Sequence, residues 1–186
     1  MTPDLPAWAR SGRSGWRWTG AERPPFADPP GPDQESVWDY PRPPAIVPDA
    51  RVVVVRLAGT VIAETTRSVR VLETASAPTF YLPPDDLRME YFAQAPGTSH
   101  CEWKGAATYW TVTLPRGERV ERGAWSYEEP FGEFATLQGY LAFYPPMFEC
   151  RVDGERVEPQ AGGFYGGWVT SEIVGPMKGD PGTGGW

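Results

Sequence analysis

The sequence predicts a mainly β fold of antiparallel sheets with one short helix. Three observations support this fold class. Short runs of β-branched and aromatic residues recur between turn residues in the middle of the chain. Helical periodicity is scarce, and the 22 prolines and 21 glycines of the 186 residues gather mainly towards the two ends. We therefore expect a Pro/Trp-rich arm at residues 1–45, a folded domain at 46–160, and a Gly/Trp-rich tail at 161–186 that packs on the domain.

The first half of the expected domain contains four strands and then the short helix. Pro83 and Pro84 end the fourth strand because proline cannot donate a ladder hydrogen bond. Asp85 and Asp86 follow, and these residue types cap a helix that we expect over residues 87–92. Valine-rich or alternating patterns place the four strands at residues 51–56, 59–63, 68–71 and 79–82.

The second half of the domain contains five further strands. Asp153 and Gly154 lie between two short apolar runs, a pattern typical of a two-residue type I′ hairpin. Strands at such short spacing, with few helices between them, are typical of an all-β domain. The strands are expected at residues 107–114, 124–127, 140–144, 149–152 and 155–157.

The arm and the tail are both rich in aromatic residues, which disordered segments lack. Prolines across the arm argue against a regular helix or a central strand there. We therefore expect part of the arm to pack in an extended form against the domain. The tail interleaves glycine with aromatic residues from Gly162 to Trp168 and again at Gly184–Trp186, so we expect it to dock as well. The arm's aromatic residues are Trp8, Trp16, Trp18, Phe26, Trp38 and Tyr40.

Net charge and hydropathy limit which binding partners and which cellular compartment we expect for the protein. The net charge of −7 makes a nucleic-acid partner unfavourable, since backbone binding requires clustered Lys and Arg. No stretch of 18 apolar residues is present, which predicts no membrane association, and no apolar leader is visible near the start. We therefore expect a soluble cytoplasmic protein, in which Cys101 and Cys150 are reduced thiols.

Several kinds of catalytic and cofactor site are not expected. Two cysteines and one histidine are too few for a structural zinc site. Neither a P-loop nor a dinucleotide-binding glycine motif is present, so we predict no metal and no cofactor. His100 and Cys101 are adjacent, but neighbouring side chains of an extended segment point to opposite faces and could not share a proton.

A cluster of rings around one lysine is the candidate site. Lys104 stands at the start of the strand with the strongest pattern, where it is either a surface side chain or a ligand-facing cation. Aromatic residues with polar tips near it suggest a cleft between sheets, although such rings often belong to a core. Buried charge requires a partner, which suggests a pair of Glu73 with Arg67 or Lys104. The predicted ligand-binding residues are Arg67, Glu73, Tyr81, Cys101, Trp103, Lys104, Tyr109, Trp125, Tyr127 and Tyr144.

An ordered succession of motifs resembles the domain-of-unknown-function family numbered 427, which is also catalogued under a nucleotidyltransferase-like name. The resemblance spans roughly residues 50–150, and the flanks at 35–44 and 163–170 look like the actinobacterial form, with extensions at both ends. The motifs are Gly59 through Glu73, Pro78 through Pro83, Cys101 through Ala106, Trp125-Ser126-Tyr127 and Ala142-Phe143-Tyr144.

The resemblance implies a β-tent-like domain, in which two antiparallel sheets meet at an angle. This fold is similar to methionine sulfoxide reductase B, Yippee and the thalidomide-binding domain of cereblon. Those relatives typically hold zinc through four cysteines, which this chain lacks. The nucleotidyltransferase-like name implies acidic residues that hold Mg²⁺ at phosphates, and no matching motif is found.

Three functions remain open from the sequence. The first is a small-molecule or peptide-binding domain, or an enzyme of unknown reaction, with the lysine and the rings in an inter-sheet cleft. The second is a nucleotide or single-stranded nucleic-acid binder, in which rings stack on bases and Arg67, Arg70 and Lys104 meet phosphates. The third is a protein-interaction module that uses the Pro-rich arm or the Trp-rich tail. The ligand, the reaction and the oligomeric state do not follow from the sequence.

Overall fold

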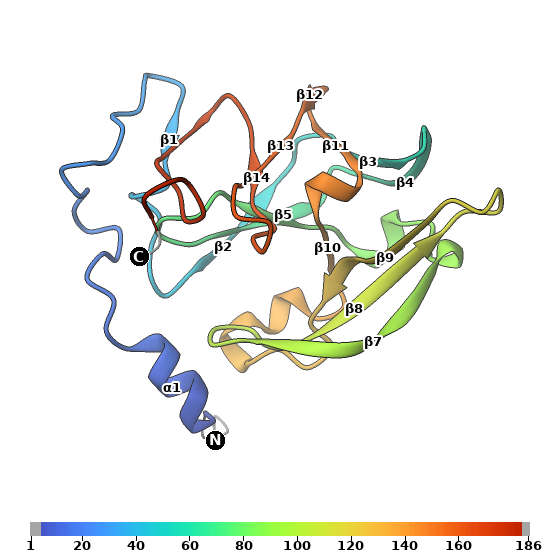
Figure 1. Ribbon diagram of the computed structural model, residues 1–186, viewed down its shortest axis with the longest axis horizontal. Coiled ribbons are helices and arrows are strands. Elements are labelled where there is room, and N and C mark those ends of the chain that lie inside the picture. Colours follow the sequence, from blue (N-terminus) through green and yellow to red (C-terminus); the bar gives the residue numbers. More distant parts are fainter. Residues whose placement is uncertain (1–4, 184–186) are drawn as a thin grey trace.

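Antiparallel sheets make up most of the protein, seen here in a computed structural model that describes residues 5–183 (Figure 1). Within that range the one α-helix is α1 (Ala7–Arg13). The expected mainly β fold class, with antiparallel sheets and one short helix, is confirmed. The helices of this part of the chain are too short or too polar for any of them to span a bilayer.

The first sheet has four strands in the order β12-β11-β3-β4. Strands β11 and β12 are joined by Asp153 and Gly154, both with positive φ, as the predicted type I′ hairpin requires. The Asp-Gly pair in the sequence thus predicted both the turn and the way in which β11 and β12 pair. The strands are β3 (Val53–Leu57), β4 (Thr60–Thr65), β11 (Glu149–Val152) and β12 (Glu155–Arg156).

Two further sheets meet along one edge. Leu82 and Leu141 exchange backbone hydrogen bonds of 2.8 and 2.9 Å, which join the end of β6 to β10. Away from this line the three-stranded sheet β2-β5-β6 and the four-stranded sheet β10-β9-β8-β7 are separate, so the two enclose a space. Their strands are β2 (Ala45–Asp49), β5 (Ser68–Leu72), β6 (Thr79–Tyr81), β7 (Phe92–Cys101), β8 (Gly105–Thr113), β9 (Arg119–Ser126) and β10 (Leu141–Phe143).

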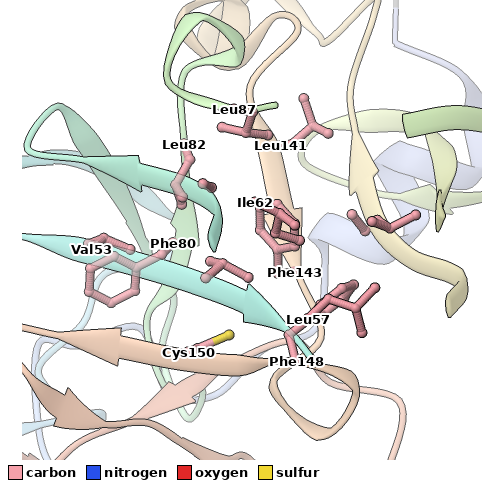
Figure 2. Close-up of a cluster of buried hydrophobic side chains, with 14 of the residues drawn as sticks. Val53, Leu57, Ile62, Phe80, Leu82, Leu87, Leu141, Phe143, Phe148 and Cys150 are labelled. Carbon is pink, nitrogen blue, oxygen red and sulfur yellow. The ribbon is translucent and has the colours of Figure 1, made fainter. Parts of the chain in front are cut away.

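The main hydrophobic core consists of aliphatic residues and phenylalanines from the first sheet and from one face of β6 and β10. Phe80 and Leu82 point into this core, whereas Tyr81 between them points to the other side, as the period of two in a strand requires. Phe80 also stacks on Trp168 with ring centroids 4.9 Å apart. Figure 2 shows the packing of Val53, Leu57, Ile62, Phe80, Leu82, Leu87, Leu141, Phe143, Phe148 and Cys150.

The arm and the tail pack on the domain through two small sheets. Strand β1 (Glu35–Ser36) pairs in parallel with β15 (Ile173–Val174), and β13 (Glu158–Pro159) pairs with β14 (Trp168–Val169). Residues after β1 and β15 form a separate buried cluster, which includes Trp38. Arm and tail therefore hold each other as well as the domain. The tail's predicted contact at Gly184–Trp186 lies outside the described residues.

The predicted helix over residues 87–92 is wrong. Two short 3-10 turns, η1 (Pro84–Asp86) and η2 (Met89–Tyr91), take its place, and β7 already begins at Phe92. The reason is that this backbone pairs with β4: Arg88 N–H donates to the Ile62 carbonyl at 2.9 Å. Two more 3-10 segments follow, η3 (Gly132–Leu137) and η4 (Pro145–Met147).

Several elements were absent from the prediction, including the short strands β1, β2, β13, β14 and β15. The two longest of the missed elements are the helix α1 and the strand β7. Helix α1 forms in the arm, where a regular helix was not expected, because no proline occurs between Pro6 and Pro24. Strand β7 is an edge strand with both Pro96 and Gly97 at an irregular point of its ladder. Its largely exposed sequence shows no alternation of apolar and polar residues, so the pattern could not indicate it.

Candidate functional site

A pocket of about 290 Å³ lies between the three-stranded and the four-stranded sheet. The strands β6, β7, β8 and β9 provide eight of its lining residues, and loops and the tail provide the others. Rings alternate there with hydroxyl, thiol, amine and carboxylate groups. The lining residues are Glu73, Ser76, Thr79, Tyr81, Ser99, His100, Cys101, Glu102, Lys104, Ala107, Tyr109, Trp125, Tyr127, Tyr144, Phe164, Tyr165, Gly166 and Lys178.

The tight turn between β7 and β8 places a thiol and an amine side by side. Cys101 is the last residue of β7 and pairs with Gly105, the first of β8, so Lys104 lies three residues after Cys101 in the turn. Gly105 has a φ of +100°, a conformation that favours glycine. The turn therefore brings both Cys101 and Lys104 to the pocket.

Lys104 is buried, with 8% of its surface exposed. Its Nζ lies 5.9 Å from the ring centroids of both Tyr127 and Phe134. Burial alone would lower the pKa of Lys104, but interactions with Cys101, Tyr81 and Glu73 outweigh it and the pKa is raised. Within residues 5–183, no carboxylate oxygen lies within 4.0 Å of this ammonium group. Lys104 therefore carries a buried positive charge without an ion-pair partner.

Hydroxyl groups and rings form a further part of the pocket wall. Trp125 donates from Nε1 to the Tyr81 hydroxyl at 3.3 Å, and its ring lies 4.4 Å from that of Tyr144. The Ser99 and Tyr109 hydroxyls are 2.8 Å apart. Burial raises the pKa of Tyr81 and, well above the usual value, that of Tyr127. These two phenols therefore stay protonated and are able to donate hydrogen bonds.

A second group of charges lies where the arm and the tail approach the pocket. Glu73 forms an ion pair with Arg42, whose guanidinium lies over the Trp16 ring at 3.4 Å. The Lys178 Nζ also lies over that ring, at 3.7 Å. Burial and repulsion by Arg42 lower the pKa of Lys178 to about 8, although Glu73 and Glu102 oppose the shift. The charge state of Lys178 is therefore sensitive to any new anion nearby.

Helix α1 covers the outer side of the β7–β8 turn. Arg13 donates from Nε to the Glu102 carbonyl at 2.7 Å, and its guanidinium lies 4.8 Å from the Trp103 ring centroid. Trp8 packs edge-on against His100 at 5.2 Å. These contacts fix the turn that presents the thiol and the amine.

The structure brings eight of the ten predicted site residues to one pocket. These are Glu73, Tyr81, Cys101, Lys104, Tyr109, Trp125, Tyr127 and Tyr144.

The other two predicted residues do not line the pocket. Trp103 belongs to the β7–β8 turn, and its ring is buried beside Arg13. Arg67 has a 60% exposed side chain and binds Asp86, with Nη2 at 2.6 Å from Oδ1. The suggested ion pair of Glu73 with Arg67 or Lys104 is therefore not formed, because Arg42 occupies the carboxylate of Glu73.

Sequence reasoning missed the part of the pocket that comes from the tail. Phe164, Tyr165 and Lys178 all line it, more than 50 residues after Lys104. The glycines around the two rings indicated a docked tail, but no local pattern indicates where a tail docks. Lys178 carried no signal, since its neighbours are glycine, proline and methionine.

Other candidate sites offer fewer charged or reactive side chains to a ligand. A groove of about 450 Å³ between η4 and the β3–β4 turn has no lysine and no buried charged side chain. Cys150 is a thiol of the main core, with 1% of its surface exposed. Over residues 5–183, no three His, Cys, Asp or Glu side chains gather in a way that would hold a metal ion.

The comparisons place the chain in a family. A family described as a domain of unknown function, DUF427, matches residues 45–158. The chain belongs to this family. The DUF427 segment runs from β2 to the start of β13, and it contains the turn with Cys101 and Lys104. The pocket residues of the tail lie outside it. A comparison with curated proteins finds no match for the chain.

Proposed function

We propose that this DUF427 protein binds a small organic anion with a flat, aromatic or unsaturated body. The observation that carries the proposal is the buried ammonium of Lys104, which lines a ring-walled pocket and has no carboxylate within 4.0 Å among the described residues. A buried charge is costly unless it is paired, and a ligand anion would supply that pairing.

The balance of charge around the pocket also supports an anionic ligand. Arg42, Lys104 and Lys178 carry positive charge, whereas Glu73 and Glu102 carry negative charge. With Lys178 protonated, three cations face two carboxylates, which leaves one positive charge. One ligand carboxylate would neutralise this excess, and it would also help to keep Lys178 protonated, since a nearby anion favours the charged form.

The rings support a flat ligand of small size. Tyr81, Trp125 and Tyr144 give the wall aromatic surfaces, and the neighbouring hydroxyls give it a few polar points. Pockets with this composition hold small molecules, which rings and polar groups orient together. The volume of about 290 Å³ suits a ligand with one ring rather than a dinucleotide or a long peptide.

The alternative functions have less support. A nucleic-acid binder was expected to use Arg67 and Arg70 at phosphates, but Arg67 binds Asp86 and Arg70 binds Glu35, with Nη1 at 3.1 Å from its carboxylate. An interaction module was expected to use the prolines at 41–44, but these lie in the arm beside buried Tyr40 and Arg42. Because the two arginines already form ion pairs and the arm is already packed within the protein, a small-molecule ligand is favoured over these alternatives.

Thermal unfolding with matched ligand pairs tests the proposal. Benzoate, cinnamate and 3-benzoylpropionate are each compared with the corresponding neutral amide. An acid at roughly ten times its Kd should raise Tm by about 3–6 °C, and its amide should raise it much less. Lys104→Met should remove the shift, whereas Arg119→Met, at an exposed ion pair with Glu121, should keep it. Equal shifts for acid and amide, or a shift that survives Lys104→Met, would contradict the proposal.

A further inference from the structure

We propose that Cys101 is a nucleophile that adds to the pocket's ligand when this carries an α,β-unsaturated carbonyl group next to its acid. The inference rests on the proposed function, since it takes the same ligand class and adds a covalent step. It gives the thiol a chemical role that binding alone does not require.

The geometry of the β7–β8 turn supports a reactive thiol. Cys101 is half-buried and lines the same pocket as Lys104. The lysine stands three residues further on, in a turn fixed by the pairing of Cys101 with Gly105. The thiolate is the nucleophilic form of a cysteine, and the Lys104 ammonium would pair with it in the same pocket as it forms. Since Lys104 has no carboxylate partner among residues 5–183, its charge is available to the sulfur and the ligand.

The addition balances without a further reactant. The Cys101 thiolate attacks the β-carbon of the conjugated carbonyl, and a carbon–sulfur bond forms. The electron pair of the carbon–carbon double bond moves to the carbonyl oxygen and gives an enolate. The proton that the thiol lost to solvent is replaced by one that the α-carbon gains from solvent. Nothing is oxidised or reduced, and no group leaves.

Two phenols are placed to stabilise the enolate oxygen. Tyr81 and Tyr127 line the same pocket as Cys101, so their hydroxyls and the thiol face one ligand space. Burial keeps both phenols protonated, and a protonated phenol donates a hydrogen bond to a developing oxyanion. Trp125 Nε1 donates to the Tyr81 oxygen, which leaves the Tyr81 proton free for another acceptor.

The second cysteine provides an internal control. Cys150 has 1% of its surface exposed, packs in the main core, and has a pKa raised by burial and by Glu149. A thiol in such surroundings is inert. Any adduct that reflects general thiol reactivity of the unfolded chain would mark Cys150 and Cys101 alike.

The experiment uses the full chain with 3-benzoylacrylate, which combines a ring, a conjugated ketone and a carboxylate. Its saturated counterpart, 3-benzoylpropionate, binds the same site but has no double bond to attack. Adduct formation is followed by mass spectrometry with peptide mapping, beside free glutathione at the same pH. The adduct should form on Cys101, at a rate that saturates and exceeds that of glutathione by about tenfold or more.

The variants separate the thiol from the lysine. Cys101→Ser should form no adduct, Lys104→Met should react about tenfold more slowly or worse, and Arg119→Met should react as the natural chain does. Competition by 3-benzoylpropionate should slow the natural chain, which tests the site without any substitution. A rate no higher than that of glutathione, an adduct on Cys150, or no effect of Lys104→Met would overturn the inference. If 3-benzoylpropionate still stabilises the protein in that case, the proposed function stands; if it does not, both fail.

Discussion

The two faces of strands β6, β9 and β10 differ in chemistry. One face sends Phe80, Ala124 and Phe143 into the main core, which holds aliphatic and phenylalanine side chains. The other face sends Tyr81 and Trp125 to the pocket, where every large lining side chain except Phe164 carries a polar atom. The same backbone thus carries a dry face and a polar face. Substitutions at neighbouring positions of one strand should therefore affect either the stability of the core or the properties of the pocket.

The largest effect is expected from removal of residues 1–44, which tests whether both faces depend on the arm. This removal takes away buried Val37, Trp38 and Tyr40 and the Arg42 partner of Glu73. Because loss of a single buried aromatic side chain costs about 3–5 kcal/mol, the combined loss should exceed about 5 kcal/mol and unfold the domain. Circular dichroism and urea titration check this. A truncated chain that keeps its cooperative transition would show that the arm is dispensable.

Phe80→Ala tests the dry face alone. Phe80 is 1% exposed and stacks on Trp168, so its truncation should lower the free energy of unfolding by about 3–5 kcal/mol. Urea unfolding measures the loss. Below the transition, ligand affinity should change little, since Phe80 does not line the pocket. A large loss of affinity in the folded variant would show that the two faces are coupled.

Lys178→Met tests the charge at the edge of the polar face. The folded pKa of about 8 lies below the ordinary 10.5, so the unfolded chain binds more protons between those values. Stability therefore carries a penalty below pH 8 that is relieved as pH rises towards 10.5. Relative to the natural chain, Lys178→Met should gain most below pH 8 and progressively less above it.

The measurement is the difference between the two unfolding free energies across this pH range, because tyrosines and Cys150 titrate in both proteins. A difference that does not vary with pH would show that Lys178 has an ordinary pKa.

Tyr81→Phe removes one hydroxyl from the polar face, at the residue that follows Phe80 in strand β6. Loss of the hydrogen bond from Trp125 should cost about 1 kcal/mol of stability. Addition of 3-benzoylacrylate to Cys101 should slow far more than binding of 3-benzoylpropionate weakens. Mass spectrometry and thermal shifts report the two. Equal effects on both would indicate that Tyr81 serves binding only.

Arg67→Met is expected to have the smallest effect. Its side chain is 60% exposed and pairs with Asp86, and exposed pairs contribute about 0–1 kcal/mol. Affinity for the ligand acids should stay the same. A loss of affinity would show that Arg67 takes part in ligand binding, although it does not line the pocket.

The strands that the sequence predicted well are those with one buried face. Strand β8 alternates buried with partly exposed positions, so its pattern was visible. Strand β7 is largely exposed and paired on one side only, and Pro96 and Gly97 interrupt it, so its residues carry no period. Helix α1 was missed for a related reason: prolines elsewhere in the arm outweighed the seven residues that lack one.

The sequence also allowed prediction of the site residues that lie in the β7–β8 turn and in the strands next to it. Cys101 and Lys104 are close in the chain, and rings with polar tips such as Tyr81 and Trp125 indicated a lined cleft. Lys178 was not accessible, since its place at the pocket depends on tertiary contacts, such as the bond from its N–H to the Ala75 carbonyl at 2.8 Å. Long-range docking of this kind leaves no local pattern.

The parallel pair of β1 and β15 has a consequence for how the pocket is assembled. Both strands lie outside residues 45–158, yet they fasten the segment that delivers Phe164, Tyr165 and Lys178 to the rim of the pocket. The turn with Cys101 and Lys104 therefore lies inside the stretch that matches DUF427, whereas these rim residues lie outside it. If the proposed function holds, substitutions at Phe164, Tyr165 or Lys178 should change which ligands fit, without altering the turn that carries Cys101 and Lys104.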